Sequence, residues 1–338
     1  MTLHNTQPGR LLGCSGAYWE TCTLHAAVKL ELFSVLADAT LDAATLARRI
    51  NTNSRATAML LDALCAMDLL KKTADSYRNT AAARTFLCKD SPRYVGYMIM
   101  HHHHLVESWM RLDEAVTNGR PVSTRQPHDE TLQRESFLMG MFNLAMGMAP
   151  ELVPTLDLSG RTRLLDLGGG PGTWAIQFCR HNPQLTATVF DLATTRPFAE
   201  KTIAAFDLTE RVRFAPGDFH QDKLGGPYDV VWLSHILHGE SSGDSRKIVA
   251  SAAAALEKGG LLIIHEFILN DSRDAPLFPA LFSLNMLVAT EGGQSYSESE
   301  LRQMMEQAGI GEIQRTPYCG PTDSGILLGT KISRKHHS

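Results

Sequence analysis

The feature that most constrains the fold is a regular alternation of short apolar runs and helical segments from Arg163 onward. The apolar runs predict strands at 164–167, 186–190, 212–215, 228–233, 261–267, 312–316 and 325–330. Helical patterns lie between them at 173–181, 198–206, 245–256 and 298–307. Such an alternation predicts an α/β fold with a parallel, doubly wound sheet that helices cover on both faces. Ligands of such sheets bind beyond the carboxyl ends of the strands.

A glycine-rich loop follows the first of these strands. The stretch from Asp166 to Gly172 reads DLGGGPG and fits the pattern D-x-G-x-G-x-G. Glycines tolerate positive φ and let the backbone approach a ligand closely, so we expect cofactor contacts at Asp166, Gly168 and Gly170. A dinucleotide-binding loop would have a third glycine where Thr173 stands. A purely structural turn is the alternative interpretation.

Acidic residues stand at the ends of the next two strands. Asp191 ends the second strand, where a carboxylate can bind a ribose diol, although dinucleotide-binding folds share this spacing. Asp218 and Phe219 follow the third strand, where the acid can accept the adenine amino group and the ring can stack on the base. Asp218 could instead cap a turn. Three strand ends in this order predict a site for an adenosine-containing cofactor.

The first ~90 residues read as short helices with little strand signal. Helices are expected at 18–30, 45–50 and 55–67, the last capped by Asn53-Ser54, and the polar stretch 71–79 suits a small β-wing. This order is the winged-helix pattern, whose use in DNA binding would require a basic third helix. The helix has Asp62 and no Lys or Arg after residue 55, and the net charge is -4, so no nucleic-acid partner is expected. A DNA-binding regulator remains the less favoured alternative.

The length of 338 residues favours more than one domain. We expect a winged-helix-like domain over 1–90, a helical linker over 91–153 that lines the substrate pocket, and a cofactor-binding catalytic domain over 154–333. No apolar run approaches the ~18 residues of a membrane span, and residues 1–10 lack the basic-then-apolar order of a signal peptide, so no membrane partner is expected. Six cysteines without a CxxC pair indicate a reduced, cytoplasmic protein. In the run His101–His104 only the outer two side chains share a helix face, so no metal site is expected.

The motifs in order resemble a known family, the class I S-adenosylmethionine-dependent O-methyltransferases of the plant caffeate and acetylserotonin type, in their bacterial branch. The resemblance covers nearly the whole chain. The motifs that carry it are 142–146, 166–172, 190–192, 217–219, 235–238, 265–269 and 292–293. It implies a Rossmann-like methyltransferase sheet preceded by an all-α, winged-helix-like dimerisation domain. It also implies S-adenosyl-L-methionine as cofactor, S-adenosyl-L-homocysteine as product, and a homodimer.

The resemblance assigns roles to individual residues. Gly168, Asp191, Asp218 and Phe219 match cofactor-contacting positions, and Ser234 stands where plant members have a contacting Lys. His238 matches the general base, and Glu266 matches the acid that orients it. The second orienting Glu of the family is replaced by Ser295. The residues that match the acceptor pocket or lie near it are Trp109, Phe142, Asn143, Met146 and Met286, with core packing as the alternative.

Methyl transfer from a sulfonium is an in-line displacement, in which the protein aligns the acceptor and removes the proton of a neutral hydroxyl. A positioned histidine suits that task. His238 is the expected base, with His235 as a rival three residues earlier. The expected function is therefore O-methylation of a small, aromatic, hydroxylated molecule. The alternatives are C- or N-methyl transfer, or a cofactor-binding relative with non-methylating chemistry.

Overall fold

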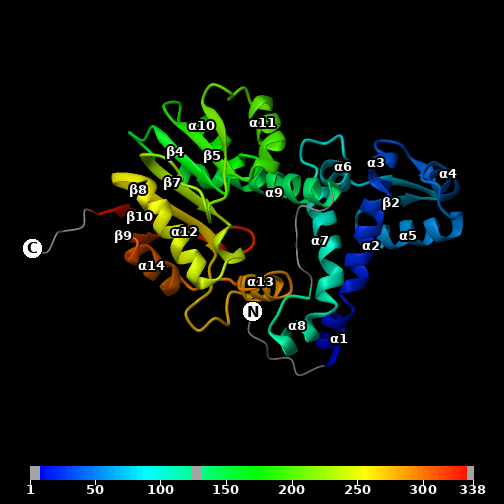
Figure 1. Ribbon diagram of the computed structural model, residues 1–338. Coiled ribbons are helices and arrows are strands. Elements are labelled where there is room, and N and C mark those ends of the chain that lie inside the picture. Colours follow the sequence, from blue (N-terminus) through cyan, green and yellow to red (C-terminus); the bar gives the residue numbers. More distant parts are fainter. Residues whose placement is uncertain (1–7, 123–130, 333–338) are drawn as a thin grey trace, which may run out of the picture. The chain divides into compact units, whose positions relative to one another are not determined.

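The structure is a computed structural model that describes residues 8–122 and 131–332, with side chains of the second range described from Arg134 onward (Figure 1). The chain divides into two compact units. Unit 1 comprises residues 1–105 and 131–143, and unit 2 comprises residues 106–130 and 144–338. The helices α7 (Gly96–Trp109) and α9 (Thr131–Leu152) each contribute residues to both units.

Unit 1 begins with short helices around a small core. Its remaining helices are α1 (Pro8–Gly16), α2 (Tyr18–Lys29), α3 (Leu32–Leu36), α4 (Ala43–Arg49), α5 (Ser54–Ala66) and α6 (Ala81–Phe86). The expected all-α character needs correction, because β1 (Leu41–Asp42), β2 (Leu70–Thr73) and β3 (Ser76–Asn79) form an antiparallel sheet in the order β1-β3-β2. Strands β2 and β3 occupy the stretch in which the polar sequence predicted a wing. The side chain of Asn53 caps α5 by accepting from the Ala56 N–H.

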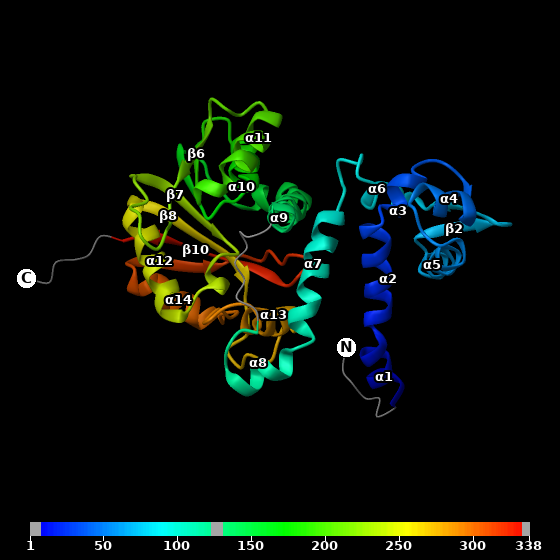
Figure 2. The same ribbon diagram turned by 45° about the vertical axis from the view of Figure 1, so that its right-hand side comes forward.

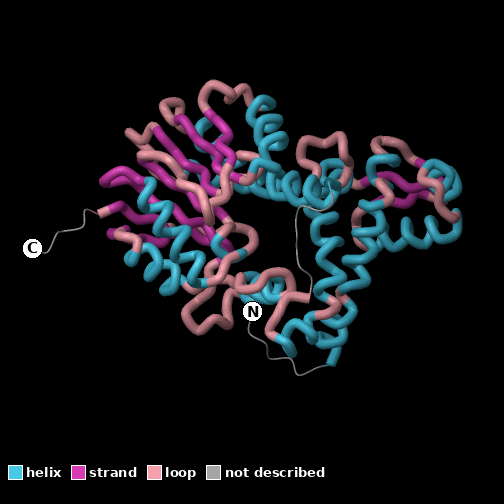
Figure 3. The backbone as a smooth tube through the Cα atoms, viewed as in Figure 1, coloured by secondary structure: helices cyan, strands magenta, loops and turns pink. Residues whose placement is uncertain are grey.

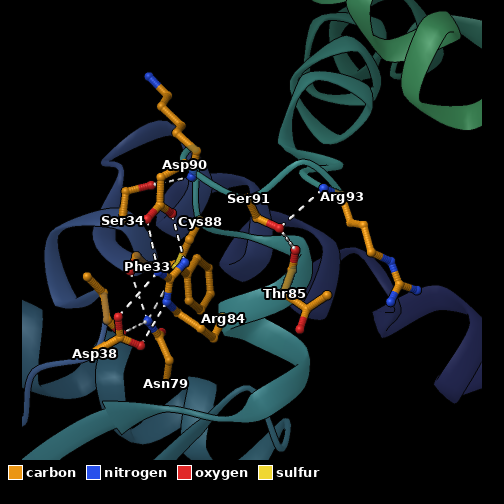
Figure 4. A network of polar contacts seen from close by, with 12 residues as sticks. Phe33, Ser34, Asp38, Asn79, Arg84, Thr85, Cys88, Asp90, Ser91 and Arg93 are labelled. Atoms are coloured by element: carbon orange, nitrogen blue, oxygen red, sulfur yellow. Dashed lines mark hydrogen bonds and ion pairs between the residues drawn. The ribbon is translucent and has the colours of Figure 1, made fainter. Parts of the chain in front are cut away.

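A polar network joins α3 to α6 in this unit (Figure 4). Arg84 donates to both carboxylates that flank it, Asp38 at 2.9 Å and Asp90 at 2.8 Å. Asn79 donates to the backbone oxygens of Phe33 and Ala37, at 2.9 and 2.8 Å. The Phe33 carbonyl already accepts the Ala37 N–H at 2.9 Å, so Asn79 adds a second donor there and ties β3 to the end of α3.

Unit 2 is built on a seven-stranded sheet, whose strands are magenta in Figure 3. The strands are β4 (Arg163–Leu167), β5 (Thr186–Asp191), β6 (Val212–Pro216), β7 (Tyr228–Ser234), β8 (Leu256–Phe267), β9 (Ile310–Arg315) and β10 (Ser324–Lys331). Their order is β6-β5-β4-β7-β8-β10-β9. The expected parallel pairing is found from β4 to β8, but β10 departs from it and runs antiparallel to both β8 and β9. The connection from Arg315 to Ser324 is too short for the helical crossover that a parallel pair requires.

Helices cover both faces of this sheet (Figures 1 and 2). Helices α10 (Thr173–His181) and α11 (Arg196–Ala205) pack on one face, and α12 (Ser242–Ala255) and α14 (Glu298–Gln307) pack on the other. Successive strand residues point to opposite faces, so Leu164 lies in one core and Leu165 in the other, both 0% exposed. The fold thus brings the carboxyl ends of the five parallel strands to one edge.

The second half of α9 packs into the core beside α10, through Ala145, Met148, Ala149 and Leu152. This packing accounts for the apolar composition of Arg134–Thr155, which by length and composition alone could cross a membrane. In the described part of the chain it is the one helix that passes that test. Polar residues such as Asn143 interrupt this segment, so it contains no unbroken apolar run of about 18 residues.

Candidate active site

The glycine-rich loop lies at the carboxyl end of β4 and leads into α10. Gly168, Gly170 and Gly172 have φ of 67°, 54° and 79°, a region that side chains disfavour. Packing adds a second requirement, because a Cβ on Gly168 would lie 2.6 Å from Ile236. A Cβ on Gly169 would lie 2.6 Å from the carboxyl carbon of Asp166. Beside Gly170, by contrast, a Cβ would meet nothing within 4 Å, so the loop borders open space there.

Asp166 lies beneath this loop and is 1% exposed. Its Oδ2 accepts the Ala175 N–H at 3.1 Å, while Oδ1 has no hydrogen-bond partner among the described residues. Burial, together with the charge of Asp191, raises the pKa of Asp166 to about 7, against the lowering effect of the Ala175 hydrogen bond. This carboxyl group therefore changes its charge near neutral pH.

Asp191 ends β5 and contacts the glycine-rich loop directly. Its Oδ2 accepts the Gly170 N–H at 2.8 Å, and its Oδ1 accepts the Leu192 N–H at 2.7 Å and the Thr195 hydroxyl at 3.0 Å. The parallel pairing of β4 with β5 holds the two together, since the Gly168 N–H donates to the Phe190 carbonyl at 2.9 Å. Two motifs that lie 21 residues apart in sequence thus form one surface.

Asp218 and Phe219 follow β6. The Asp218 carboxylate accepts the His220 N–H and the Gln221 side-chain amide, both at 2.9 Å, which is the turn-capping arrangement that the sequence left open. Phe219 lies with its ring centroid 4.7 Å from that of His220. The Ser234 hydroxyl contacts Nδ1 of the buried His265 at 3.0 Å, so in this structure its side chain is engaged inside the sheet. Contacts of these three residues with a cofactor remain predictions.

His238 and Glu266 meet at the carboxyl ends of β7 and β8. His238 lies in the short 3-10 turn η3 (Leu237–Gly239), and its Nδ1 is 2.8 Å from Oε2 of Glu266. Glu266 is 2% exposed and also accepts the backbone N–H groups of Leu237 at 2.9 Å, Phe267 at 3.2 Å and His238 at 3.3 Å. Although burial favours the neutral acid, His238 and His235 hold the pKa of Glu266 well below its usual range.

The contact through Nδ1 determines which nitrogen of His238 is free. A neutral imidazole carries one proton, and a carboxylate acceptor draws it to the nitrogen that it faces. With the proton on Nδ1, Nε2 keeps its lone pair and can accept a proton from a bound molecule. The pair Glu266–His238 is therefore arranged as an acid that orients a base.

Aromatic rings pack around His238. The Phe267 ring lies stacked 5.6 Å from His238, and the Phe282 ring meets it edge-on at 4.8 Å. Phe278 contacts Phe267 at 5.0 Å. Phe278 and Phe282 belong to α13 (Leu277–Leu287), a helix that sequence reasoning missed. Their spacing of four residues places them on one helix face, which is the signal that could have found them.

The expected acceptor-pocket residues are distributed over both units. Met286 lies on α13 and is 4% exposed, Trp109 donates to the Asn285 side chain at 2.9 Å, and Met146 accepts from Gln177 at 3.1 Å, all within unit 2. Phe142 and Asn143 belong to unit 1, where the Asn143 amide donates to the Tyr94 carbonyl. A common pocket for these five residues remains a prediction.

Residues 109–311 match the sequence model of the O-methyltransferase domain. This chain belongs to the O-methyltransferase family. Residues 12–89 of this O-methyltransferase match the dimerisation domain of the same family.

Relatives agree with this assignment along nearly the whole length. The chain is 36% identical over 330 residues to the 3-hydroxy-5-methyl-1-naphthoate 3-O-methyltransferase of Streptomyces sahachiroi, covering 96% of this chain and 95% of the relative. It is 32% identical over 316 residues to the N,N-dimethyltransferase OxyT of Streptomyces rimosus, covering 90% and 91%. The crystal structure of human N-acetylserotonin methyltransferase with S-adenosylmethionine superimposes with a TM-score of 0.87 at 26% identity, covering 98% of this chain and 100% of that chain. The protein is an S-adenosylmethionine-dependent methyltransferase.

Proposed function

We propose that the enzyme transfers a methyl group to a hydroxyl of a small aromatic molecule, with His238 as general base and Glu266 as the acid that orients it. The observation that carries this proposal is the 2.8 Å contact between His238 Nδ1 and Glu266 Oε2. It leaves Nε2 as the nitrogen that receives the acceptor proton. A phenol has a pKa near ~10 and is mostly protonated at neutral pH, so removal of its proton by a base contributes typically ~10²–10⁴ in rate.

The cofactor-binding half consists of the glycine-rich loop and the acids beside it. Bound S-adenosylmethionine would supply an electrophilic methyl carbon on a sulfonium. The residues present fit it, because open space borders Gly170 and the Asp191 carboxylate lies 2.8 Å from the Gly170 nitrogen. Asp191 would bind the ribose hydroxyls, and Asp218 and Phe219 would bind the adenine. Asp166, Gly168 and the Ser234 backbone would complete the site.

An aromatic acceptor is supported by the rings beside the base. Phe267 and Phe282 flank His238 at 5.6 and 4.8 Å, and aromatic rings pair favourably at such distances. The naphthoate enzyme of Streptomyces sahachiroi is named for an aromatic acceptor with a hydroxyl group. Trp109, Phe142, Asn143, Met146 and Met286 would contact the acceptor.

The domain arrangement follows the same reasoning. We propose a winged-helix-like dimerisation domain over 1–90, a pocket-lining helical linker over 91–153 and a catalytic domain over 154–333. A homodimer is supported by the family match over 12–89 and by the large apolar side chains of Leu11, Leu12 and Trp19, which are 76%, 69% and 68% exposed. A cytoplasmic location is supported by six free cysteines.

Nitrogen or carbon methylation is the second candidate. It is favoured by the similarity to OxyT, which is named as an N,N-dimethyltransferase, and by Ser295 at the position of the second acid. Ser295 is fully buried, and its hydroxyl has no hydrogen-bond partner among the described residues, so it does not replace a carboxylate. Transfer of labelled methyl to a panel of phenols, amines and carbon acids separates the two candidates.

The variant His238→Ala tests the base directly. We expect it to lower methyl transfer to a phenol by ~10²–10⁴ while the affinity for S-adenosylmethionine, measured by calorimetry, changes little. The matched control is His181→Ala, which changes an exposed histidine at the end of α10. Transfer by His238→Ala at the rate of this control would refute the assignment.

A further inference from the structure

Two imidazoles converge on one buried carboxylate in unit 2. Oε2 of Glu266 lies 2.8 Å from His238 Nδ1 and 3.7 Å from His235 Nδ1. One potential ligand atom from each residue lies within 4.8 Å of the other two, and no second group of this kind occurs among the described residues. Two imidazole nitrogens and one carboxylate oxygen are a donor set that Zn²⁺ and neighbouring divalent transition metals bind. We propose that His235, His238 and Glu266 form a regulatory site for such an ion, occupation of which inhibits methyl transfer.

His235 is the residue that the catalytic pair leaves unexplained. Its Nδ1 is buried and has no hydrogen-bond partner among the described residues, and 3.7 Å to Glu266 is too long for one. A buried polar atom without a partner is unfavourable, and a metal ion would supply one. The residue also has a positive φ of 56°, a conformation that side chains disfavour and that concentrates at functional sites.

Packing fixes the His235 ring in the direction of Glu266. The ring centroids of His265 and Phe267 each lie 4.3 Å from that of His235. His265 itself is not a ligand candidate, because Ser234 contacts its Nδ1 and Ser324 contacts its Nε2, both at 3.0 Å. The His265 ring therefore holds His235 in position and does not compete for the ion.

The distances suit a bound ion after a small adjustment. Zinc binds nitrogen and oxygen ligands at about 2.0–2.2 Å, so tetrahedral ligand atoms lie about 3.4 Å from one another. The distances from His238 Nδ1 and His235 Nδ1 to Glu266 Oε2, 2.8 and 3.7 Å, lie on either side of this value. Shifts of about half an ångström bring both nitrogens to this distance from Oε2. A zinc ion with three protein ligands takes water as its fourth.

Metal binding at Nδ1 reverses the tautomer that the base requires. Without the ion, the single proton of neutral His238 is on Nδ1 and Nε2 carries the lone pair. An ion can bind Nδ1 only through a lone pair on that nitrogen. The proton therefore moves from Nδ1 to Nε2, and the ring stays neutral. Nε2 then donates a hydrogen bond and cannot accept the proton of the acceptor. This inhibition, unlike the metal site itself, rests on the proposed role of His238.

The site is tested by titration of chelator-treated, full-length protein with Zn²⁺ and, separately, with Co²⁺, whose visible absorption reports its ligands. We expect one equivalent per chain to bind at the triad, and His235→Phe to weaken that binding at least tenfold. The matched control, His104→Ala, changes an exposed residue of the histidine run, which could bind metal by itself, and should leave the Co²⁺ spectrum unchanged. Equal affinity and an equal spectrum in His235→Phe would overturn the proposal.

Inhibition is measured separately, as methyl transfer over a range of Zn²⁺ concentrations relative to the metal-free rate of each variant. We expect loss of transfer in the unchanged protein, recovery on addition of EDTA, and a shift of at least tenfold in the inhibiting concentration in His235→Phe. Inhibition of both proteins at the same concentration would overturn the proposal. Binding that depends on His235 but does not slow transfer would support the site and contradict the role of His238 as base.

Discussion

Two carboxyl groups at the same edge of the sheet are almost equally buried, but their pKa values are shifted in opposite directions. Asp166 near the end of β4 is 1% exposed, and Glu266 near the end of β8 is 2% exposed. Burial raises the pKa of Asp166 to about 7, whereas the pKa of Glu266 is held well below its usual range. The difference lies in their partners. Asp166 accepts one backbone N–H and has another acid nearby, while Glu266 accepts three backbone N–H groups and contacts two imidazoles.

The comparison shows that burial alone does not decide charge at this edge. Glu266 keeps a negative charge beside His238, which under the proposed function suits stabilisation of an imidazolium formed when the acceptor loses its proton. Asp166, beneath the glycine-rich loop, is neutral or charged according to pH. Three substitutions test this contrast.

The largest expected effect is on stability, from Asp166→Asn. A pKa of about 7 in the folded protein, against an ordinary value of 3.8, corresponds to about 4 kcal/mol of stability that the wild type lacks at pH 8. The folded state holds this proton more tightly than the unfolded chain, so stability falls as pH rises from about 4 to about 7 and is constant above that. Urea unfolding without cofactor should show the variant to be more stable at pH 8, by up to that amount, and equally stable near pH 4. A variant less stable than the wild type at pH 8 would contradict the raised pKa of Asp166.

Glu266→Gln should lower methyl transfer by about 10², or about 2.7 kcal/mol of transition-state stabilisation. The amide oxygen can still accept backbone N–H groups, but the charge that stabilises the His238 imidazolium is lost. Labelled-methyl transfer measures the effect, with Glu306→Gln on the exposed face of α14 as the control. Similar rates for the two variants would show that the charge of Glu266 does not act on the base.

The smallest effect is expected from Asp191→Asn, which should weaken S-adenosylmethionine binding about tenfold, since hydrogen bonds to a charged group contribute about 1.5–3 kcal/mol. The carboxylate lies 2.8 Å from the Gly170 nitrogen, beside the proposed ribose position. Calorimetry on this variant and on Asp157→Asn, an exposed control, gives the ratio of affinities. An unchanged affinity would remove Asp191 from the cofactor site.

Much of the sheet could be predicted because apolar strands and helices have different periods. Strand β4 begins one residue before the predicted strand, and β10 extends one residue beyond it at each end. Strand β8 begins at Leu256 and not at 261, because the Gly259-Gly260 pair reads as a turn although it continues the strand. Helix α13 was missed because apolar residues occupy nearly every position in it, so the shared face of Phe278 and Phe282 does not stand out from the rest. The reversal of β10 depends on pairing between strands distant in sequence, which local patterns do not contain.

The candidate site was predictable to the level of strand ends. Sequence order placed His238 and Glu266 after neighbouring strands, and the structure has them 2.8 Å apart. Sequence order gave no sign that His235 also faces Glu266, because this orientation depends on the left-handed backbone conformation of His235. The local hydrogen bonds of Asp218 and the inward side chain of Ser234 depend on rotamers, which sequence periodicity does not determine.

The position of β10 has a consequence for protein synthesis. Gly325 pairs with Glu266, and Ile326 pairs with His265, so the strand beside Glu266 is synthesised after the other strands of this sheet. A nascent polypeptide folds from its amino end as it leaves the ribosome, and until residues 324–331 emerge, β8 is an open edge that can pair with other chains. The glycine-rich loop and its acids are complete long before that moment. Under the proposed roles, a growing chain therefore completes its methyl-donor site well before it completes the surroundings of its base.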